Sequence, residues 1–318
     1  MKKNISILLL LSLILFSGCR KAVSNEAVRV AGMKGPTSMG MVYLMKEAED
    51  GIVPYTFSIH GSADEISPKL IRGELDFACI PANLASVLWN NTNGALTVLA
   101  INTYGVLYLV EKGDSVKDLS SLKGKTIYAT GKGSTPEYTL RYLLSLNGLD
   151  PDKDVTLEFR SEPAEIVALL RQNDKAIALL PQPYTTAAQS AVPELHIVAD
   201  LSKVWEQSGA NGKLITGVLV VRTEFLEKHP EAVRDFLKAY RTSIEQVLAD
   251  DAAAAELIAR YGIADQLIAE KALPYCSLTY ADGKSMKKAL SGYLEALYEQ
   301  NPKAIGGSLP DDSFYYIR

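Results

Sequence analysis

Hydrophobic residues in the body of the chain fall into short continuous runs that alternate with segments of helical periodicity. Residues 96–101 and 177–180 are two such runs, and no charged residue interrupts either of them. Continuous apolar runs are typical of strands that are covered on both faces, and strands that alternate with helices indicate parallel α/β units. The pattern therefore predicts an α/β fold.

Two stretches of the chain repeat the same order of elements. Residues 28–38 and 126–136 each begin with a β-branched strand, pass through a turn that contains Gly and Lys, and open a helix with Ser, Thr or Pro. The strand, helix and strand that come next keep the same order in both stretches. Agreement in order and register indicates an internal duplication, and hence two similar lobes. Three residue pairs stand 100 positions apart: Glu65/Glu165, Ile66/Ile166 and Pro81/Pro181.

Two further strand-like segments, residues 106–110 and 217–221, are predicted to carry the chain from one lobe to the other and back. After Glu224 the pattern becomes helical, with apolar residues at helical spacing over 233–248 and 286–297. We interpret both apolar stripes as core packing. The tail is therefore expected to pack on the first lobe.

The expected domain boundaries follow from these crossings. Residues 27–105 and 217–318 are predicted to form lobe 1, which is discontinuous in sequence, and residues 106–216 to form lobe 2. No run in either part approaches the length of apolar chain that spans a bilayer, so we expect both lobes to be soluble.

The first residues of the chain have the pattern of a targeting segment. Lys2 and Lys3 precede an apolar run over 5–16, which as a helix would reach about 18 Å and so fall short of a bilayer core of about 30 Å. The run is therefore typical of a signal peptide, predicted over residues 1–18. Residues 19–26 are polar and are expected to form a tether.

The residues that end this segment resemble the lipobox of bacterial lipoproteins, because Ser17 and Gly18 precede Cys19. The resemblance implies a diacylglyceryl group, with fatty chains such as palmitate, on Cys19. It also implies an extracytoplasmic protein that is anchored by lipid to the bacterial cell membrane. The alternative is an ordinary secretory signal with a chance cysteine.

Composition narrows the function classes. The chain has 33 Lys+Arg against 37 Asp+Glu, a net charge of −4, and lacks the basic clusters of a nucleic-acid-binding protein. Three cysteines are too few for a disulfide scaffold or a four-cysteine zinc site, and we expect no metal site. Cys79 and Cys276 could pair, but Cys79 lies in an apolar strand and is interpreted as a buried free thiol.

The candidate binding residues follow the carboxyl ends of the predicted strands, where the helices begin and where open α/β sheets bind ligands. Most carry hydroxyl or amide groups, which fit a small-molecule pocket. The alternative for Thr37, Ser38, Ser134 and Thr135 is that they only cap helices, and Asn83 and Tyr184 could be surface residues. The candidates are Pro36, Thr37, Ser38, Ser62, Asn83, Asn102, Tyr104, Ser134, Thr135, Glu162, Gln182, Tyr184 and Thr216.

Motifs of nucleotide and hydrolytic chemistry are incomplete. Residues 131–134 (Gly-Lys-Gly-Ser) lack the full spacing of a phosphate-binding loop, and 131–136 lack the third glycine of the dinucleotide fingerprint. The sequence contains no G-x-S-x-G elbow and no H-E-x-x-H pair. We therefore expect no catalytic residues, no cofactor and no enzymatic activity.

The duplicated lobes, together with residues 131–138 (GKGSTPEY) and 180–184 (LPQPY), resemble the substrate-binding proteins of bacterial ABC importers. The closest resemblance is to the nitrate/sulfonate/bicarbonate type, also called the NMT1/THI5-like family. It implies a two-lobed type II periplasmic-binding fold with a hinge of two crossing strands, which closes on one solute. It also implies an ABC permease and its ATPase as partners, and a monomer.

Two other functions stay open beside the receptor. One is an enzyme on the same fold, because a eukaryotic branch of the family makes a thiamine pyrimidine; that branch uses a cysteine-rich iron site that this chain lacks. The other is a ligand sensor for a membrane kinase. We expect a small organic solute with a carboxylate, sulfonate or polar heterocycle, held mainly by neutral donors because no arginine was identified in the loops.

Overall fold

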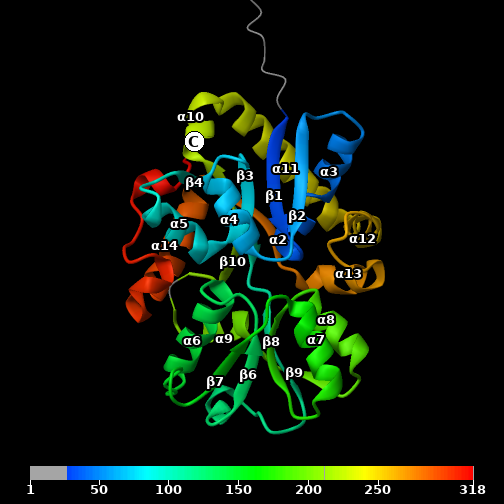
Figure 1. The fold of residues 1–318 in the computed structure, drawn as a ribbon, viewed down its shortest axis with the longest axis vertical. Helices are drawn as coiled ribbons and strands as arrows, with labels where there is room; N and C mark the ends of the chain where they lie inside the picture. The colour runs from blue at the N-terminus through cyan, green and yellow to red at the C-terminus, as the bar shows by residue number, and fades with distance from the viewer. Residues whose placement is uncertain (1–26, 211, 318) are drawn as a thin grey trace, which may run out of the picture.

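A computed structural model describes residues 27–210 and 212–317, which form two lobes that are each built around one β-sheet (Figure 1). This architecture confirms the predicted α/β fold with two lobes. The first sheet has the strand order β11-β4-β10-β3-β1-β2, and the second has the order β7-β6-β8-β5-β9. The strands are β1 (Val28–Met33), β2 (Tyr55–His60), β3 (Phe77–Pro81), β4 (Leu96–Tyr104), β5 (Leu107–Lys112), β6 (Thr126–Ala129), β7 (Thr156–Phe159), β8 (Ile177–Pro181), β9 (Leu195–Asp200), β10 (Ile215–Arg222) and β11 (Leu278–Asp282).

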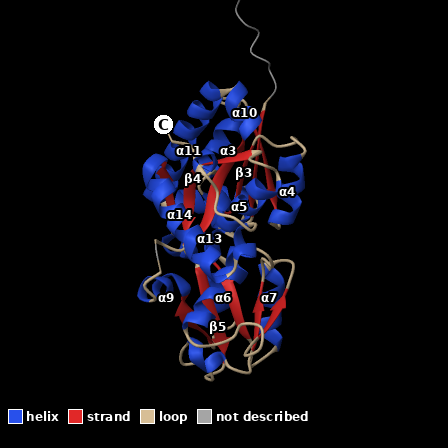
Figure 2. Ribbon diagram, turned by 90° about the vertical axis from the view of Figure 1, so that its left-hand side faces the viewer, coloured by secondary structure: helices blue, strands red, loops and turns tan. Residues whose placement is uncertain are grey.

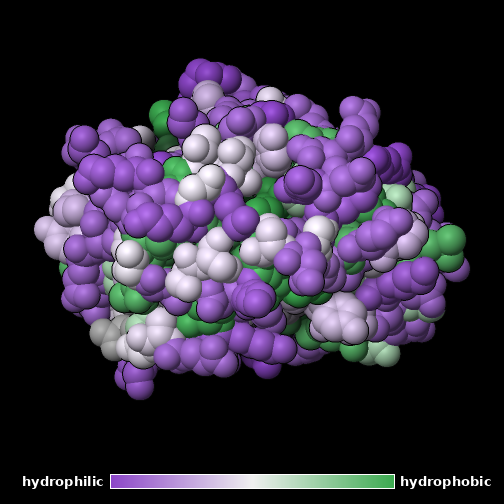
Figure 3. All heavy atoms as spheres, turned by 90° about the horizontal axis from the view of Figure 1, so that it is seen from below, coloured by the Kyte–Doolittle hydropathy of each residue, from purple (hydrophilic) through white to green (hydrophobic). Residues whose placement is uncertain are grey.

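Helices lie on both faces of each sheet (Figure 2). This covering explains why the sequence shows continuous apolar strands. The face viewed from below is mostly hydrophilic, with hydrophobic residues scattered over it (Figure 3). The helices are α2 (Pro36–Met39), α3 (Val42–Glu49), α4 (Ala63–Ile71), α5 (Ala82–Asn91), α6 (Thr135–Leu146), α7 (Pro163–Gln172), α8 (Tyr184–Ala191), α9 (Leu201–Gln207), α10 (Thr223–Lys228), α11 (Pro230–Ala249), α12 (Asp251–Arg260), α13 (Gln266–Ala272) and α14 (Gly283–Gln300), with short 3-10 turns at Leu119–Leu122, Leu273–Tyr275, Pro302–Ile305 and Asp312–Phe314.

The two sheets repeat one topology. In the first sheet β1 pairs in parallel with β2 and β3, and in the second sheet β6 pairs in parallel with β7 and β8. One antiparallel strand then follows in each sheet, β10 beside β3 and β5 beside β8. The duplication seen in the sequence is therefore a duplication of sheet topology, and it places equivalent loops of the two lobes at equivalent sheet edges.

The chain crosses between the sheets directly before β5 and directly before β10. Residues Gly105 and Val106 alone separate β4 from β5, so the sequence interpretation of 106–110 and 217–221 as crossings was off by a few positions. These strands each belong to one sheet, where they supply the antiparallel member. Gly105 lacks a side chain for a steric reason, because a Cβ there would lie 2.0 Å from the Ser202 hydroxyl.

Strand β11 was not predicted, because its sequence LTYAD has neither an apolar run nor a regular alternation. It pairs antiparallel with β4 at the edge of the first sheet. Within the described chain we found no helix with the length and apolar character that a membrane span needs.

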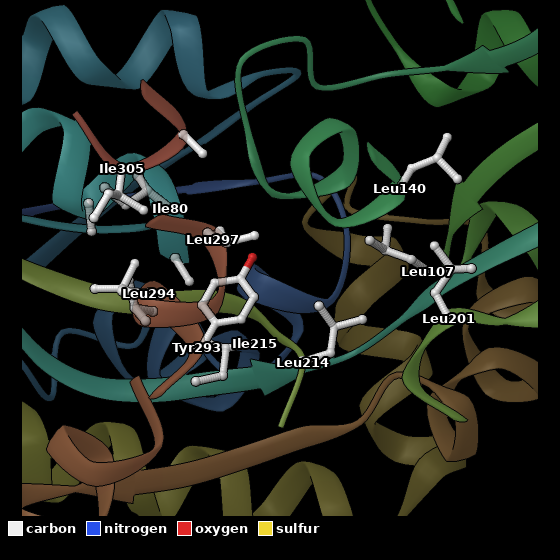
Figure 4. Packing of buried hydrophobic residues seen from close by; sticks show 14 of the residues in the cluster. Ile80, Leu107, Leu140, Leu201, Leu214, Ile215, Tyr293, Leu294, Leu297 and Ile305 are labelled. Carbon is white, nitrogen blue, oxygen red and sulfur yellow. The ribbon is translucent and has the colours of Figure 1, made fainter. Parts of the chain in front are cut away.

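A continuous apolar cluster joins the two lobes beside the crossings (Figure 4). Tyr293 of α14 packs against Trp205 of α9 with ring centroids 5.4 Å apart, and Tyr142 of α6 also packs against Trp205, at 4.9 Å. Trp205 and Tyr293 are fully buried. The lobes are thus fixed to each other by apolar packing at one flank.

A second aromatic core lies inside lobe 1, between α11 and the sheet. Phe236 stacks on Phe77 with centroids 4.2 Å apart and on Tyr240 at 5.9 Å. Cys79 lies in this core, where burial raises the pKa of its thiol to about 12. Cys276 is also buried and free, so the two thiols do not form a disulfide.

A buried carboxylate links three strands at the end of the first sheet away from the crossings. Asp76 accepts hydrogen bonds from the guanidinium groups of Arg29 at 2.8 and 3.0 Å and of Arg222 at 3.1 Å. Burial alone would raise the pKa of Asp76, but the hydrogen bonds from the two arginines outweigh it and hold the pKa below its ordinary value. The ionised carboxylate therefore stabilises the pairing of β1, β3 and β10.

Replacing this carboxylate should destabilise the protein in a pH-dependent way. We expect Asp76→Asn to lower the free energy of unfolding by about 3 kcal/mol at pH 7, because two arginines lose their counter-charge. Since the pKa is depressed in the folded state, the contribution is fully present above the unfolded pKa of about 4 and is lost as the pH falls through the folded value. Urea unfolding at several pH values measures it.

Asp174→Asn is the matched control, because Asp174 also pairs with a basic residue, Lys112, but is itself exposed. We expect a much smaller loss of stability from it. A loss for Asp76→Asn no larger than for this control would contradict the role assigned to Asp76.

Candidate functional site

A cavity of about 500 Å³ lies between the lobes, and loops of both lobes line it. These loops run from the carboxyl ends of β1, β2, β6 and β7 into α2, α4, α6 and α7. Parallel pairing puts the ends of β1 and β2 at one edge of the first sheet and those of β6 and β7 at one edge of the second. The duplication therefore supplies two similar sets of loops to one cavity.

Seven of the thirteen residues expected from the sequence lie in the cavity wall. Four come from lobe 1 and the adjoining strand β10, and three from lobe 2. They come from five segments that are far apart in the sequence, and the fold brings these segments together around the cavity. The seven are Pro36, Thr37, Ser62, Ser134, Thr135, Gln182 and Thr216.

Three of the expected residues are buried behind the wall and do not line the cavity. Asn102 donates from Nδ2 to the carbonyl oxygen of Thr37 at 3.2 Å and to the hydroxyl of Tyr240 at 3.0 Å, so it holds the first loop against the core. Ser38 is fully buried next to Gly32. A Cβ on Gly32 would lie 2.1 Å from the Ser38 hydroxyl. Asn83, also fully buried, donates to the carbonyl oxygen of Ala304 at 2.8 Å.

The other three expected residues lie beside the cavity. Glu162 directly precedes α7 as its N-cap residue. Its carboxylate faces lobe 1, since a Cβ on Gly61 would lie 2.5 Å from the Glu162 Oε1 atom. Burial and the charge of Glu162 raise the pKa of Tyr184. Burial likewise raises the pKa of Tyr104, whose ring lies 5.0 Å from the Lys213 ammonium.

Three basic side chains that were not among the residues expected from the sequence also line the cavity. Lys34 follows β1, Lys132 lies in the loop before α6, and Arg160 follows β7. The expectation that no arginine stands in the loops was therefore wrong. Arg160 directly follows β7, which ends at Phe159. The signal that could have identified Arg160 is its position: it is a basic residue directly after a strand, at the start of a loop that leads into a helix.

Arg160 is held in place by its neighbours. Its guanidinium donates to Glu158 Oε2 at 3.1 Å and to the carbonyl oxygen of Phe159 at 3.1 Å, and lies 5.2 Å from the centre of the Tyr128 ring. The adjacent wall is apolar, with side chains such as Phe159 and Leu84. The cavity wall thus combines apolar side chains and neutral polar groups with three cations and one carboxylate, that of Asp64, and among the cations Arg160 is held by its neighbours.

The two lobes also touch each other beside the cavity through polar groups. The Thr135 hydroxyl of α6 donates to Asn83 Oδ1 of α5 at 3.1 Å, and Asn83 Nδ2 lies 3.4 Å from the carbonyl oxygen of Gly133. Elsewhere on the rim, Gly61 of lobe 1 meets Glu162 of lobe 2. These contacts form only when the two sets of loops face each other closely.

The described residues were also searched for a cluster of metal-binding side chains. Over residues 27–210 and 212–317, no group of three or more His, Cys, Asp or Glu side chains is arranged to hold a metal ion. His60, which is buried next to the cavity loops, lies 3.3 Å from Glu65 Oε2 and 3.0 Å from the Ser58 hydroxyl. These contacts give His60 a structural place in the loop before α4.

Comparison with sequence families gives one match. The NMT1-like family matches residues 45–262, which is more than half of the chain. None of the curated proteins matches the chain with significant similarity.

Several solved structures share the fold. An ABC transporter protein from Parabacteroides distasonis has a TM-score of 0.72 at 24% identity, covering 92% of this chain and 99% of its own. The alkanesulfonate-binding protein SsuA from Xanthomonas axonopodis pv. citri, bound to MOPS, has a TM-score of 0.70 at 15% identity, with coverages of 90% and 95%. The ligand-binding component of an ABC-type import system from Staphylococcus aureus, with zinc bound, has a TM-score of 0.72 at 16% identity, with coverages of 92% and 97%.

Removing the hydroxyl that links the lobes should shift their equilibrium toward separation. We expect Thr135→Val to lose about 1 kcal/mol from the contacting arrangement, because Asn83 Oδ1 loses its donor. That is about a fivefold change in the ratio of contacting to separated lobes. Small-angle X-ray scattering of the ligand-free protein should show a larger radius of gyration.

Thr185→Val serves as the control, since the Thr185 hydroxyl donates to the carbonyl oxygen of Leu180 within lobe 2. It should lower the stability of lobe 2 and leave the radius of gyration unchanged. An equal change of radius in both variants would argue against the interlobe role of Thr135.

Proposed function

The chain belongs to the NMT1-like family, and on that premise we propose that it is the solute-binding receptor of an ABC importer. The observation that carries the proposal is the cavity that lies between two duplicated sets of loops. The printed descriptions of similar structures, which name ABC import systems and alkanesulfonate binding, agree with it. The partners would be a small-molecule ligand, an ABC permease and its ATPase.

The proposed mechanism is closure of the lobes about the two crossings. A solute that contacts both sets of loops gains its full interaction energy only when the lobes approach, so binding favours the closed arrangement. The Tyr293–Trp205 packing lies beside the crossings and keeps one flank together. The permease would then recognise the closed surface, and no bond in the solute needs to change.

We further propose the lobe boundaries 27–105 with 217–318, and 106–216. The signal peptide, the tether and the lipid on Cys19 fall within residues 1–26, outside the described residues. With the lipid, the receptor would be extracytoplasmic and attached to the cell membrane. We also propose that it is a monomer. These assignments rest on the sequence pattern of residues 2–19 and on the family's transport role.

The chemistry of the wall supports a small organic acid as the solute. The apolar lining favours a carbon skeleton, and Lys34, Lys132 and Arg160 provide charge for a carboxylate or sulfonate. Recognition mainly by neutral donors was expected from the sequence, and the three cations change that expectation. Beside them we propose Thr37, Ser62 and the other cavity-lining candidates named above as ligand contacts, with Asn102 and Asn83 as positioning residues.

Binding without turnover is the direct test of the receptor. Purified protein is screened by thermal shift with benzoate, benzenesulfonate, nicotinate and 2-aminoethanesulfonate. A true ligand at 100 times its dissociation constant should add about 2.7 kcal/mol of stability, and NMR should recover it unchanged. Stabilisation by none of these acids, or formation of a product, would contradict the proposal of a receptor for organic acids.

The charge of the wall can be tested with the best ligand of that screen. Lys132→Ala and Arg160→Ala should each weaken its binding about tenfold, because each removes one charge-assisted contact. Lys238→Ala, on the exposed face of α11, is the matched control and should leave the affinity unchanged. Isothermal titration calorimetry measures the three affinities.

A further inference from the structure

Gln182 is a cavity-lining side chain whose amide has a fixed orientation. It directly follows β8 and is only 3% exposed. Its Oε1 atom accepts a hydrogen bond from the Thr186 N–H at 3.3 Å and another from the Thr186 hydroxyl at 2.8 Å. Because a backbone N–H can only donate, the amide atom that faces it must be the oxygen. The contacts with Thr186 therefore leave the amide nitrogen of Gln182 as the group that is not used.

This nitrogen is a donor that has no acceptor in the protein. Within residues 27–210 and 212–317, Gln182 Nε2 has no hydrogen-bond partner, yet it is not sealed from solvent. Since the side chain is almost wholly buried and lines the cavity, the accessible surface of Nε2 belongs to the cavity. A buried donor in such a place gains most from an acceptor on a bound molecule. With its oxygen already used, Gln182 offers a solute N–H groups only.

The wall around Gln182 is neutral on the side of the crossings. Pro181 and Leu107, which face each other across the pairing of β8 with β5, both line the cavity. On lobe 1, Thr103 of β4 and Thr216 of β10 also line it, and neither hydroxyl has a partner among the described residues. Unpaired neutral polar groups from both lobes thus stand among apolar side chains in this part of the cavity.

The arginine of the wall lies at a different strand. In the second sheet β6 stands between β7 and β8, so the end of β7, which Arg160 follows, is two strand spacings or about 10 Å from the end of β8. The guanidinium is turned toward Glu158 and the Tyr128 ring. One acid group that meets Arg160 is therefore too small to reach Gln182 as well, and a solute that meets both needs a carbon skeleton between two polar ends.

From these positions we propose that the solute is an organic acid with a second, uncharged acceptor, and that Gln182 determines specificity by donating to that acceptor. The acceptor is a carbonyl oxygen or an unprotonated ring nitrogen, because the fixed amide presents N–H groups alone. The acid group meets the basic side chains. The inference rests on the proposed receptor function and deepens it: it names keto, amide and heterocyclic acids as the class of solute, in place of acids with a purely apolar tail.

The discrimination comes from desolvation of the Gln182 amide. When the lobes close on a solute, Nε2 loses contact with water. An acid with an apolar tail then leaves the N–H groups without an acceptor, whereas a keto acid supplies one at the same place. A site built to pair one polar group rejects the analogue that lacks it, because its own buried group is left unpaired. The preference should therefore appear in the affinity for solutes of equal shape.

The first test uses the unmodified protein. Isothermal titration calorimetry compares 4-acetylbenzoate with 4-isopropylbenzoate, and 5-oxohexanoate with 5-methylhexanoate. The members of each pair share the acid group and almost the same shape, and differ in whether an acceptor oxygen or a methyl group stands at the far end. We expect the keto acid of at least one pair to bind about tenfold more tightly. Equal affinities within both pairs overturn the inference and leave the receptor intact.

The second test assigns the preference to Gln182. Gln182→Leu should abolish the difference within the pair and change the affinity for the apolar acid by less than about twofold. Gln172→Leu is the matched control, because Gln172 is exposed at the end of α7 and does not line the cavity; it should retain the preference. If Gln182→Leu weakens both acids of a pair equally, Gln182 either meets the acid group or only shapes its loop, and the inference is overturned.

The remaining outcomes separate the inference from the receptor function. If neither keto acid binds while another organic acid does, the inference fails and the receptor stands. If the protein binds no organic acid at all, the receptor proposal itself is contradicted. Because the comparison within pairs needs no variant, a failure of Gln182→Leu to fold does not remove the test.

Discussion

The packing of Tyr293 against Trp205 is the contact on which the arrangement of the molecule depends. It fixes α14 of one lobe against α9 of the other, directly beside the two places where the chain crosses. With that flank held by apolar burial, the opposite loops can differ in separation while their register is preserved. The polar contacts of Asn83 with Thr135 and Gly133 lie next to this flank, since the Tyr293 hydroxyl is 3.5 Å from the Thr135 hydroxyl. A binding cavity between lobes requires this combination of one fixed flank and one adjustable face.

Much of the fold follows from the sequence, because a duplicated order of elements constrains topology strongly. The strand that ends at Pro81 and its counterpart that ends at Pro181 occupy equivalent places in the two sheets. The limits of the prediction are local. Strand β11 has no distinctive pattern, and the antiparallel places of β5 and β10 depend on pairing between distant segments. Hydrophobic periodicity does not report such pairing.

The candidate site was less predictable for a similar reason. The sequence marks which residues follow strands, and seven of them lie in the cavity wall. It does not show the direction of each side chain. Asn83 and Asn102 point into the protein because backbone carbonyl groups and Tyr240 need donors there. Arg160 was missed because the candidates after this strand were chosen among hydroxyl, amide and carboxylate residues, although Arg160 is the first residue after β7.

The double crossing has a consequence for the order in which the molecule can be assembled. All five strands of the second sheet lie between Leu107 and Asp200, whereas the first sheet needs β10 and β11 from much later in the chain. A polypeptide that emerges from its amino end can therefore complete the second sheet while the first still lacks its central strand. Until Arg222 emerges, Asp76 can pair only with Arg29, and β3 has an unprotected edge. The nascent first lobe is thus the part of the molecule most in need of a chaperone.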